Sequence, residues 1–120
     1  MADRVLFTSW GEVVRGREER ALEVFNEVLG FYGRLQQEGR IDAFDVVLLE
    51  PSSGINGYIA VRGSAEQIAS LREDEAYQRV IIDSGLVVDD LRISEGFADQ
   101  GVARQIALYQ ERASRVPQSA

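Results

Sequence analysis

The sequence contains no cysteine, no histidine and no lysine, so its thirteen basic residues are all arginine. Without cysteine it can form no disulfide, thiol nucleophile or cysteine-ligated zinc site. Without histidine it lacks the base of Ser-His triads and the usual ligand of haem, non-haem iron and catalytic zinc. Without lysine it can form no Schiff base. Catalysis would have to use carboxylates, tyrosine, hydroxyls, amides, arginine or backbone groups.

We therefore expect no cofactor and no metal centre. A metal site built only from carboxylates stays possible, but the sequence has no D-x-D-x-D-G loop or dense acidic cluster to support one. The net charge of −7 argues against nucleic acid as a partner, because phosphates require a basic face.

Length and composition indicate one globular domain. The chain has 120 residues, of which 45% are hydrophobic and 28% charged. No run approaches the roughly 20 apolar residues of a membrane helix, and the start MADRVLFTSW does not resemble a signal peptide. We expect a cytoplasmic protein with a single domain over residues 1–116 and a frayed tail at 117–120.

Hydrophobic periodicity predicts an alternation of strands and helices. The expected strands are 4–13, 41–50, 55–62 and one within 86–97. The expected helices are 17–38, a helix from 64 that continues from 74 to 83, and 100–115. A turn at 51–54 would join the second and third strands as a hairpin. Core-facing stripes are predicted at Leu22, Phe25, Leu29, Tyr32 and Leu35, with a further stripe at Val102, Ile106, Tyr109 and Ala113.

Local signals mark several helix ends. Ser64 and Gln67 have the spacing of a capping box, and Asp74 and Asp99 stand where N-caps are expected. Gly39 stands where the first helix should end.

The element order β-α-β-β-α-β with an extra C-terminal helix predicts an α+β, ferredoxin-like fold. Such an antiparallel sheet carries its helices on one face only. Yet both faces of the first strand hold apolar side chains, since Val5 and Phe7 oppose Leu6 and Trp10. A face exposed to solvent in a monomer should be more polar, so the pattern favours a two-fold homodimer that pairs two sheets.

The order of elements over about residues 4–97 resembles the dimeric α+β-barrel superfamily. The segment GSAEQIASLREDEAYQRV is similar to one common in these proteins, where a short helix leads into an acidic-aromatic stretch. The resemblance implies a homodimeric α+β barrel, with the C-terminal helix often packing on the partner subunit. Members that depend on histidine are excluded here. The branch that stays open is the cofactor-independent monooxygenases of antibiotic biosynthesis.

That branch implies a phenolic or otherwise enolisable substrate, held between sheet and helices, whose anion reacts with oxygen. By this resemblance Asn56 and Tyr58 would orient the substrate, Arg92 or Arg62 would stabilise an oxyanion, and Trp10 would stack on the ring. The predicted catalytic residues are Asn56, Tyr58 and Arg92, and the predicted substrate-binding residues are Trp10, Arg62, Gly30 and Gly33.

Each of these residues also has a structural interpretation. Trp10 is typical of a core or a dimer contact. Gly30 and Gly33 could either open space for a ligand or let the helix approach its neighbours closely. Arg92 needs a charged partner, for which Asp90 and Asp45 are candidates.

Other interpretations also stay open. Asn56 and Tyr58 can be an ordinary strand pair, with Gly57 between them permitting close packing, and Glu12 could act as a base beside Trp10. The alternatives to an enzyme are a non-catalytic ligand-binding protein and a dimeric interaction module without a pocket.

Overall fold

The computed structural model describes residues 2–50 and 54–117. Most of the predicted 51–54 turn and the predicted tail beyond residue 117 lie outside the described residues. The described elements are β1 (Arg4–Trp10), α1 (Glu18–Gln37), β2 (Ala43–Leu48), β3 (Gly57–Gly63), α2 (Ala65–Glu73), α3 (Glu75–Gly85), β4 (Arg92–Phe97) and α4 (Gln100–Ala113). The predicted order of elements is confirmed.

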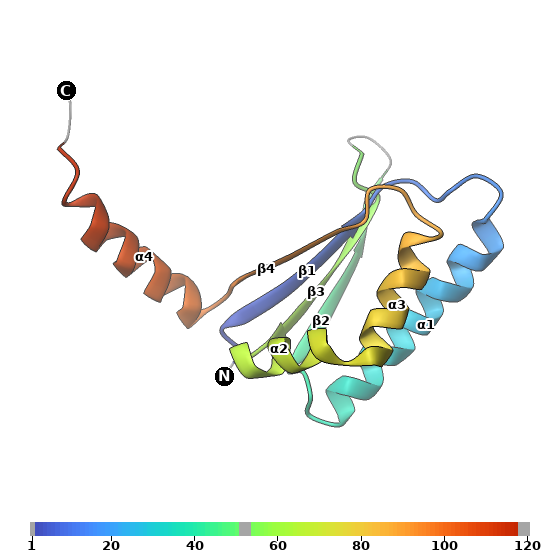
Figure 1. Cartoon of the computed structure of the whole chain (residues 1–120), viewed down its shortest axis with the longest axis horizontal. Coiled ribbons are helices and arrows are strands. Elements are labelled where there is room, and N and C mark those ends of the chain that lie inside the picture. The colour runs from blue at the N-terminus through green and yellow to red at the C-terminus, as the bar shows by residue number, and fades with distance from the viewer. Residues whose placement is uncertain (1, 51–53, 118–120) are drawn as a thin grey trace.

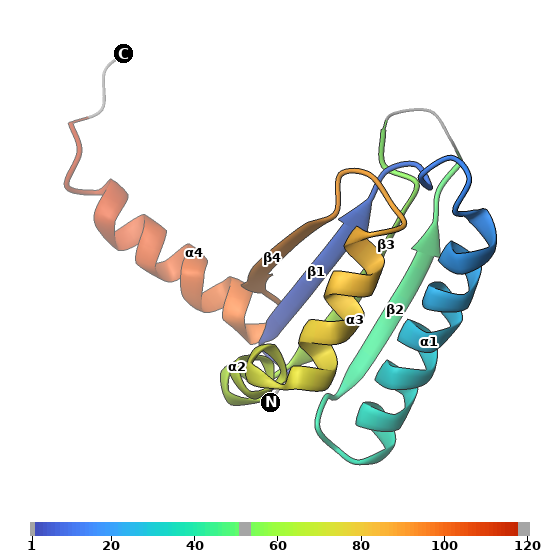
Figure 2. The same cartoon turned by 45° about the vertical axis from the view of Figure 1, so that its right-hand side comes forward.

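The four strands form one antiparallel sheet in the order β2-β3-β1-β4. The helices α1, α2 and α3 all cover the same face, which Figures 1 and 2 show from two sides. We call this the helix face and the opposite one the open face. The arrangement is the α+β, ferredoxin-like fold that the sequence predicts.

The register between β1 and β3 decides which side chains share a face. Trp10 pairs with Gly57, and Ser9 pairs with Tyr58. Because directly paired residues point to the same side of a sheet, Trp10 belongs to the helix face and Tyr58 to the open face.

The core lies between the sheet and the three helices. Its most buried large side chains are Tyr32, Leu6, Ile41, Ile68, Leu71 and Val61. The predicted stripe on α1 is wrong at its start, because Leu22 is 62% exposed while Ala21 and Val24 are buried. Ala21 brings only a methyl group to the interface, so α1 can lie close to its neighbours there. Leu22 and Phe25 turn instead toward a cavity.

Three helix ends follow the local signals. The Ser64 hydroxyl accepts from the Gln67 N–H at 3.1 Å, and the Gln67 side chain accepts from the Ser64 N–H at 2.8 Å, which confirms the capping box. The Asp74 carboxylate accepts from the Ala76 N–H at 2.7 Å and caps α3. Helix α1 ends in a Schellman motif in which Gly39 has a φ of 74°.

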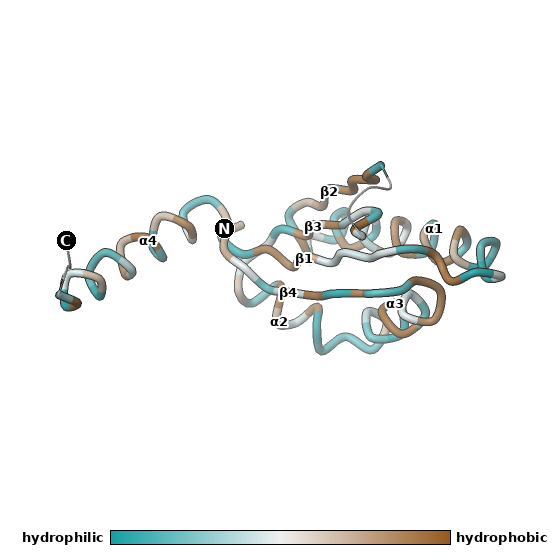
Figure 3. The backbone as a smooth tube through the Cα atoms, turned by 90° about the horizontal axis from the view of Figure 1, so that it is seen from above, coloured by the Kyte–Doolittle hydropathy of each residue, from teal (hydrophilic) through white to brown (hydrophobic). Residues whose placement is uncertain are grey.

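Helix α4 extends away from the other elements (Figure 1). The radius of gyration is 17.2 Å, against about 14 Å for a compact chain of this length. The tube in Figure 3 shows apolar and polar segments alternating along α4 outside the main body. Its predicted stripe is exposed, with Ile106 at 52% and Tyr109 at 74%. Within one protomer this stripe has no partner among the described residues.

The N-terminal segment holds the first turn of α4 in place, and no aspartate side chain caps the helix. The Asp3 carbonyl accepts from the Ala98 N–H at 3.0 Å, and the Asp3 carboxylate pairs with Arg104 at 3.3 Å. Asp99 occupies the N-cap position with a φ of 49°, but its side chain makes no capping bond. It pairs instead with Arg62 at 3.7 Å. The prediction that Asp99 caps the helix is therefore wrong.

Candidate functional site

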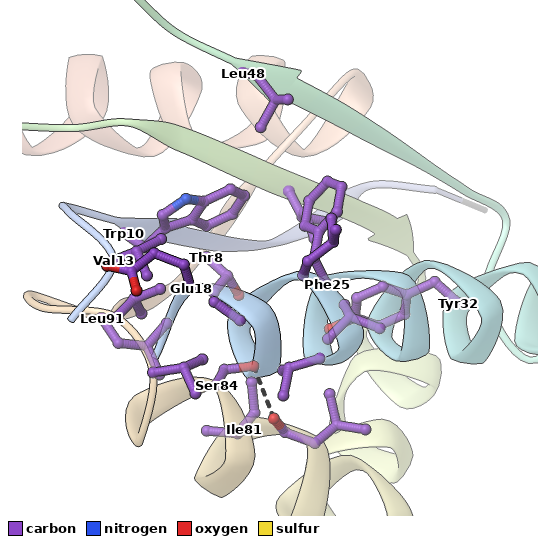
Figure 4. Close-up of a pocket in the computed structure, with 18 residues that line it drawn as sticks. Thr8, Trp10, Val13, Glu18, Phe25, Tyr32, Leu48, Ile81, Ser84 and Leu91 are labelled. Carbon is purple, nitrogen blue, oxygen red and sulfur yellow. Dashed lines mark hydrogen bonds between the residues drawn. The ribbon is translucent and has the colours of Figure 1, made fainter. Parts of the chain in front are cut away.

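A cavity of about 360 Å³ lies between the helix face of the sheet and the helices α1 and α3. Figure 4 shows the side chains that surround it. Three aromatic rings form much of its wall: Trp10 from β1, and Phe25 and Tyr32 from α1. Aliphatic side chains such as Ile59 and Ile81 supply most of the rest. A predominantly apolar cavity of this size is typical of small-molecule sites.

The position of Trp10 follows from the residue that it faces across the strand. Its ring lies over Gly57, where a Cβ atom would meet Cζ2 of the indole at 2.6 Å and the Val47 carbonyl oxygen at 2.8 Å. Any larger residue at position 57 would collide with the ring. The other edge of Trp10 meets the ring of Phe25, with centroids 6.2 Å apart at an interplanar angle of 65°. Gly57 therefore has the close-packing role that the sequence left open.

Few polar groups reach the cavity. The Ser84 hydroxyl donates to the Val80 carbonyl at 2.8 Å, drawn as the dashed line in Figure 4. Thr8 is buried on the floor formed by the sheet, and its hydroxyl has no hydrogen bond within residues 2–50 and 54–117. Thr8 is thus a polar group that a bound molecule could use.

Glu18 is the single charged residue among the described residues that line the cavity. Both of its carboxylate oxygens lie near the Gly16 N–H, at 3.1 and 3.0 Å. The hydrogen bonds from its own N–H and from that of Gly16 lower the pKa of Glu18 below its ordinary value. Glu18 is exposed to solvent, so the carboxylate is ionised at neutral pH and stands at the mouth of the cavity.

Tyr32 brings a neutral phenol to the opposite part of the wall. Burial raises the pKa of Tyr32 well above its ordinary value, and the nearby Tyr77 adds to the increase. The Tyr32 hydroxyl therefore keeps its proton across the physiological range. It can donate a hydrogen bond but cannot act as an anionic base.

The predicted site residues do not come together in one protomer. Trp10 lines the cavity, but Asn56, Tyr58 and Arg62 do not. Tyr58 lies on the open face, where its ring meets Phe7 with centroids 5.1 Å apart. The backbone of Asn56 joins it to both neighbouring strands, through its N–H to Trp10 and its carbonyl to Leu49. The sheet therefore separates Tyr58 from the cavity that Trp10 lines.

The two predicted glycines do not open this cavity. A Cβ at Gly33 would meet nothing within 4 Å, and one at Gly30 would meet only the end of the Arg34 side chain at 3.5 Å. Neither residue lines the cavity. Within one protomer neither glycine is needed for a close helix approach, and a substrate-binding role for Gly30 and Gly33 stays a prediction.

Arg92 and Arg62 do not have the neighbours that the sequence predicted for a site. Arg92 begins β4 at the edge of the sheet, and Asp45 lies on β2 at the opposite edge. Arg92 forms no ion pair with any described residue, so the predicted partners Asp90 and Asp45 do not hold it. Arg62 is on the open side of β3 and pairs with Asp99.

The sequence did not point to Glu18 or to most of the wall, and the possible base that it offered, Glu12, is not at the cavity. Glu12 follows the end of β1, is exposed and does not line the cavity. The charged pattern around Glu18 indicates only a solvated helix end. The signal that could have found Glu18 is its place one helical turn before Leu22 and two before Phe25, on the side of α1 that turns away from the core.

The described parts of the chain show no group of side chains suited to a metal centre. Over residues 2–50 and 54–117, no three acidic side chains gather where they could hold a metal ion. No described helix combines the length and the apolar character needed to span a membrane.

Neither a protein-family model nor a curated protein matches the sequence. Among solved structures, a conserved protein of unknown function from Bacteroides thetaiotaomicron, described as a possible oxidoreductase, is similar with a TM-score of 0.61. It has 11% sequence identity, and the match covers 82% of this chain and 100% of that one. A dimeric protein of unknown function with a ferredoxin-like fold, from Bacteroides fragilis, has a TM-score of 0.59 and 11% identity over 79% of this chain and 96% of its own.

A third similar structure is SnoaB, a cofactor-independent oxygenase from Streptomyces nogalater. Its TM-score is 0.49 at 16% identity, over 82% of this chain and 93% of that one. The likeness to the two Bacteroides proteins supports the ferredoxin-like fold alone, because their identity to this chain is only 11%. The chemistry has to be argued from the site.

Proposed function

We propose that this protein is a homodimer that binds a small, largely apolar molecule in the cavity between α1, α3 and the sheet. The observation that carries the proposal is a cavity of about 360 Å³ with an aromatic wall and an accessible mouth. A well-packed core leaves few voids larger than a water molecule. Apolar space on this scale is a cost to stability unless a ligand fills it.

The homodimer is proposed from the open face of the sheet. Phe7 is 36% exposed there, beside Tyr58 and close to Val5 and Val47. Apolar side chains in the middle of an otherwise uncovered sheet mark an association surface. The Bacteroides fragilis neighbour of the same fold is described as dimeric. A second copy would cover this face by a two-fold axis.

A finer version of the proposal is a cofactor-free monooxygenase acting on a phenolic or enolisable substrate. The aromatic wall around Trp10 supports it, and one structural neighbour is described as a possible oxidoreductase. The available carboxylate is a weak base, because hydrogen bonds lower the pKa of Glu18. Catalytic roles for Asn56, Tyr58 and Arg92 stay predictions. Because the cavity offers only this weak base, the site supports ligand binding better than catalysis of an oxygenation.

Thermal denaturation tests the binding proposal. The probe is 4-phenylbutanol, whose ring and short chain suit an apolar cavity. A ligand at about 100 times its dissociation constant adds roughly 2.7 kcal/mol, or several degrees in the melting temperature of a small domain. The variant Ser84→Phe places a ring in the cavity and should abolish the shift. Ile82→Phe is the matched control, because Ile82 lies on the same helix, is 62% exposed and does not line the cavity.

A shift that Ile82→Phe keeps and Ser84→Phe loses supports the cavity as the site. An equal shift in both variants, or none in the wild type, contradicts the proposal. Oxygen consumption then separates the two versions. Uptake with a panel of hydroxylated aromatic compounds supports the monooxygenase, and binding without uptake supports a non-catalytic binder.

A further inference from the structure

The charge at the mouth of the cavity is entirely negative. Of the side chains that line it, Glu18 alone carries a charge, and no arginine is among them. The arginine nearest in sequence, Arg17, donates to the Leu86 carbonyl at 2.5 Å at the end of α3. It is thereby held outside the lining and does not form an ion pair with Glu18.

A backbone N–H already binds the Glu18 carboxylate without a ligand. The Gly16 N–H holds it at 3.0 Å, and Glu18 is also the first residue of α1. A helix N-terminus carries about half a positive charge, which weakens the field of a carboxylate without reversing it. A carboxylate can accept about four hydrogen bonds, so lone pairs stay available to a ligand. The group is a preorganised acceptor beside an apolar cavity.

Apolar side chains also surround the mouth of the cavity, and they would contact the apolar part of a ligand next to the Glu18 carboxylate. Val13 is 39% exposed and Leu22 is 62% exposed, and both line the cavity. Figure 4 shows Glu18, Val13 and Trp10 close together at one end of the cavity, away from Tyr32. A ligand with an apolar body in the cavity therefore places its head group beside Glu18.

We infer that the cavity selects molecules with an apolar body and a cationic or hydrogen-bond-donating head, amines above all, and rejects carboxylates. The inference rests on the proposed binding function and names the ligand class of that site. An ammonium gains a charge-assisted hydrogen bond to Glu18. A carboxylate head meets a like charge with no arginine in the lining to offset it, in a protein of net charge −7.

The test uses three probes that share one apolar body: 4-phenylbutylamine, 4-phenylbutanol and 4-phenylbutyrate. Dissociation constants are measured by calorimetry at neutral pH and low ionic strength. We expect the amine to bind about two- to fivefold more tightly than the alcohol, the size of an exposed ion pair. The carboxylate should bind at least about tenfold more weakly than the alcohol.

The variant Glu18→Gln should abolish the preference for the amine over the alcohol. The amide oxygen of the variant can still accept from the Gly16 N–H, so the helix start is retained. Glu19→Gln is the matched control, because it removes the same charge at the next position, which is exposed and does not line the cavity. It should keep the preference for the amine.

The outcomes separate this inference from the proposed function. Binding of the alcohol without a preference for the amine, or a preference that Glu18→Gln keeps, overturns the inference and leaves the binding function standing. Loss of the preference in Glu19→Gln as well would assign it to net charge and overturn the role of Glu18. Failure of all three probes to bind would overturn the proposed function, and the inference with it.

Discussion

The indole ring of Trp10 covers Gly57, its partner on the neighbouring strand β3, so closely that a Cβ atom there would lie 2.6 Å from Cζ2 of the ring. This pair joins the fold to the candidate site, because the same ring is a wall of the cavity. The size of the residue at position 57 therefore determines the position of the Trp10 ring in the cavity wall.

Replacing Gly57 by alanine should therefore destabilise the protein and displace the ring. Alanine normally gains about 0.5–1 kcal/mol over glycine in a strand. Here the added methyl group meets both the indole and the Val47 carbonyl, and overpacking of this kind costs about 1–3 kcal/mol. Urea denaturation measures the loss, and the emission maximum of Trp10, the only tryptophan, reports the displaced ring.

The control for this substitution is Gly33→Ala on α1. A Cβ there meets nothing within 4 Å, and the helix interior prefers alanine by about 1 kcal/mol. Gly33→Ala should raise the free energy of unfolding and leave the Trp10 emission unchanged. If both alanine variants stabilised the protein, the close packing of Trp10 on Gly57 would be refuted.

Glutamate in place of Phe7 should convert the proposed homodimer to monomers. Phe7 lies on the open face against Tyr58, and burying an unpaired carboxylate in a sheet-to-sheet interface would cost several kcal/mol. Light scattering after size-exclusion chromatography should give twice the 13.4 kDa chain mass for the wild type and a single mass for the variant. Asn26→Glu, on the exposed surface of α1, is the control and should stay dimeric. A monomeric wild type at micromolar concentration would refute the dimer.

The ionised Asp74 side chain stabilises the α2–α3 junction, and this stabilisation should be lost at low pH. The Arg40 guanidinium, 2.5 Å away, lowers the pKa of Asp74, and the Ala76 N–H lowers it further. Because the pKa is lower in the folded state than in the unfolded one, the contribution is complete above the ordinary pKa of an aspartate. It is lost as the pH falls through the folded-state value.

The variant Asp74→Asn should accordingly be less stable than the wild type at neutral pH, with the difference disappearing in strong acid. Urea denaturation at a series of pH values measures this. Glu73→Gln, at a neighbouring exposed carboxylate without an ion pair in the described regions, should show no such convergence. A constant difference between Asp74→Asn and wild type at every pH would contradict the role of the ion pair.

The features predicted correctly from the sequence are those that a few neighbouring residues determine. The capping box needs only Ser64 and Gln67, and the alternation of β1 follows from its own side chains. Element order then led to the fold, since few topologies accommodate β-α-β-β-α-β.

The features that were missed depend on contacts between distant segments. The alternation along β3 puts Asn56 and Tyr58 on the same face of that strand. The sequence does not show whether this face is also the one that carries Trp10 on β1, because that depends on the register between the two strands. That register pairs Trp10 with Gly57 and so puts Tyr58 across the sheet from it. In the same way, the order of the strands puts Arg92 and Asp45 at opposite edges of the sheet. The packing of α1 buries Ala21, whereas the sequence pattern had predicted Leu22 at the core.

The location of the ligand site is tested by a titration of the protein with 4-phenylbutanol, followed through the fluorescence of Trp10. We expect a saturable change in emission for the wild type and for the open-face double variant Asn56→Ala/Tyr58→Phe, and no saturable change for the cavity variant Ser84→Phe. If the double variant lost the response while Ser84→Phe kept it, the ligand site would lie on the open face and not between α1, α3 and the sheet.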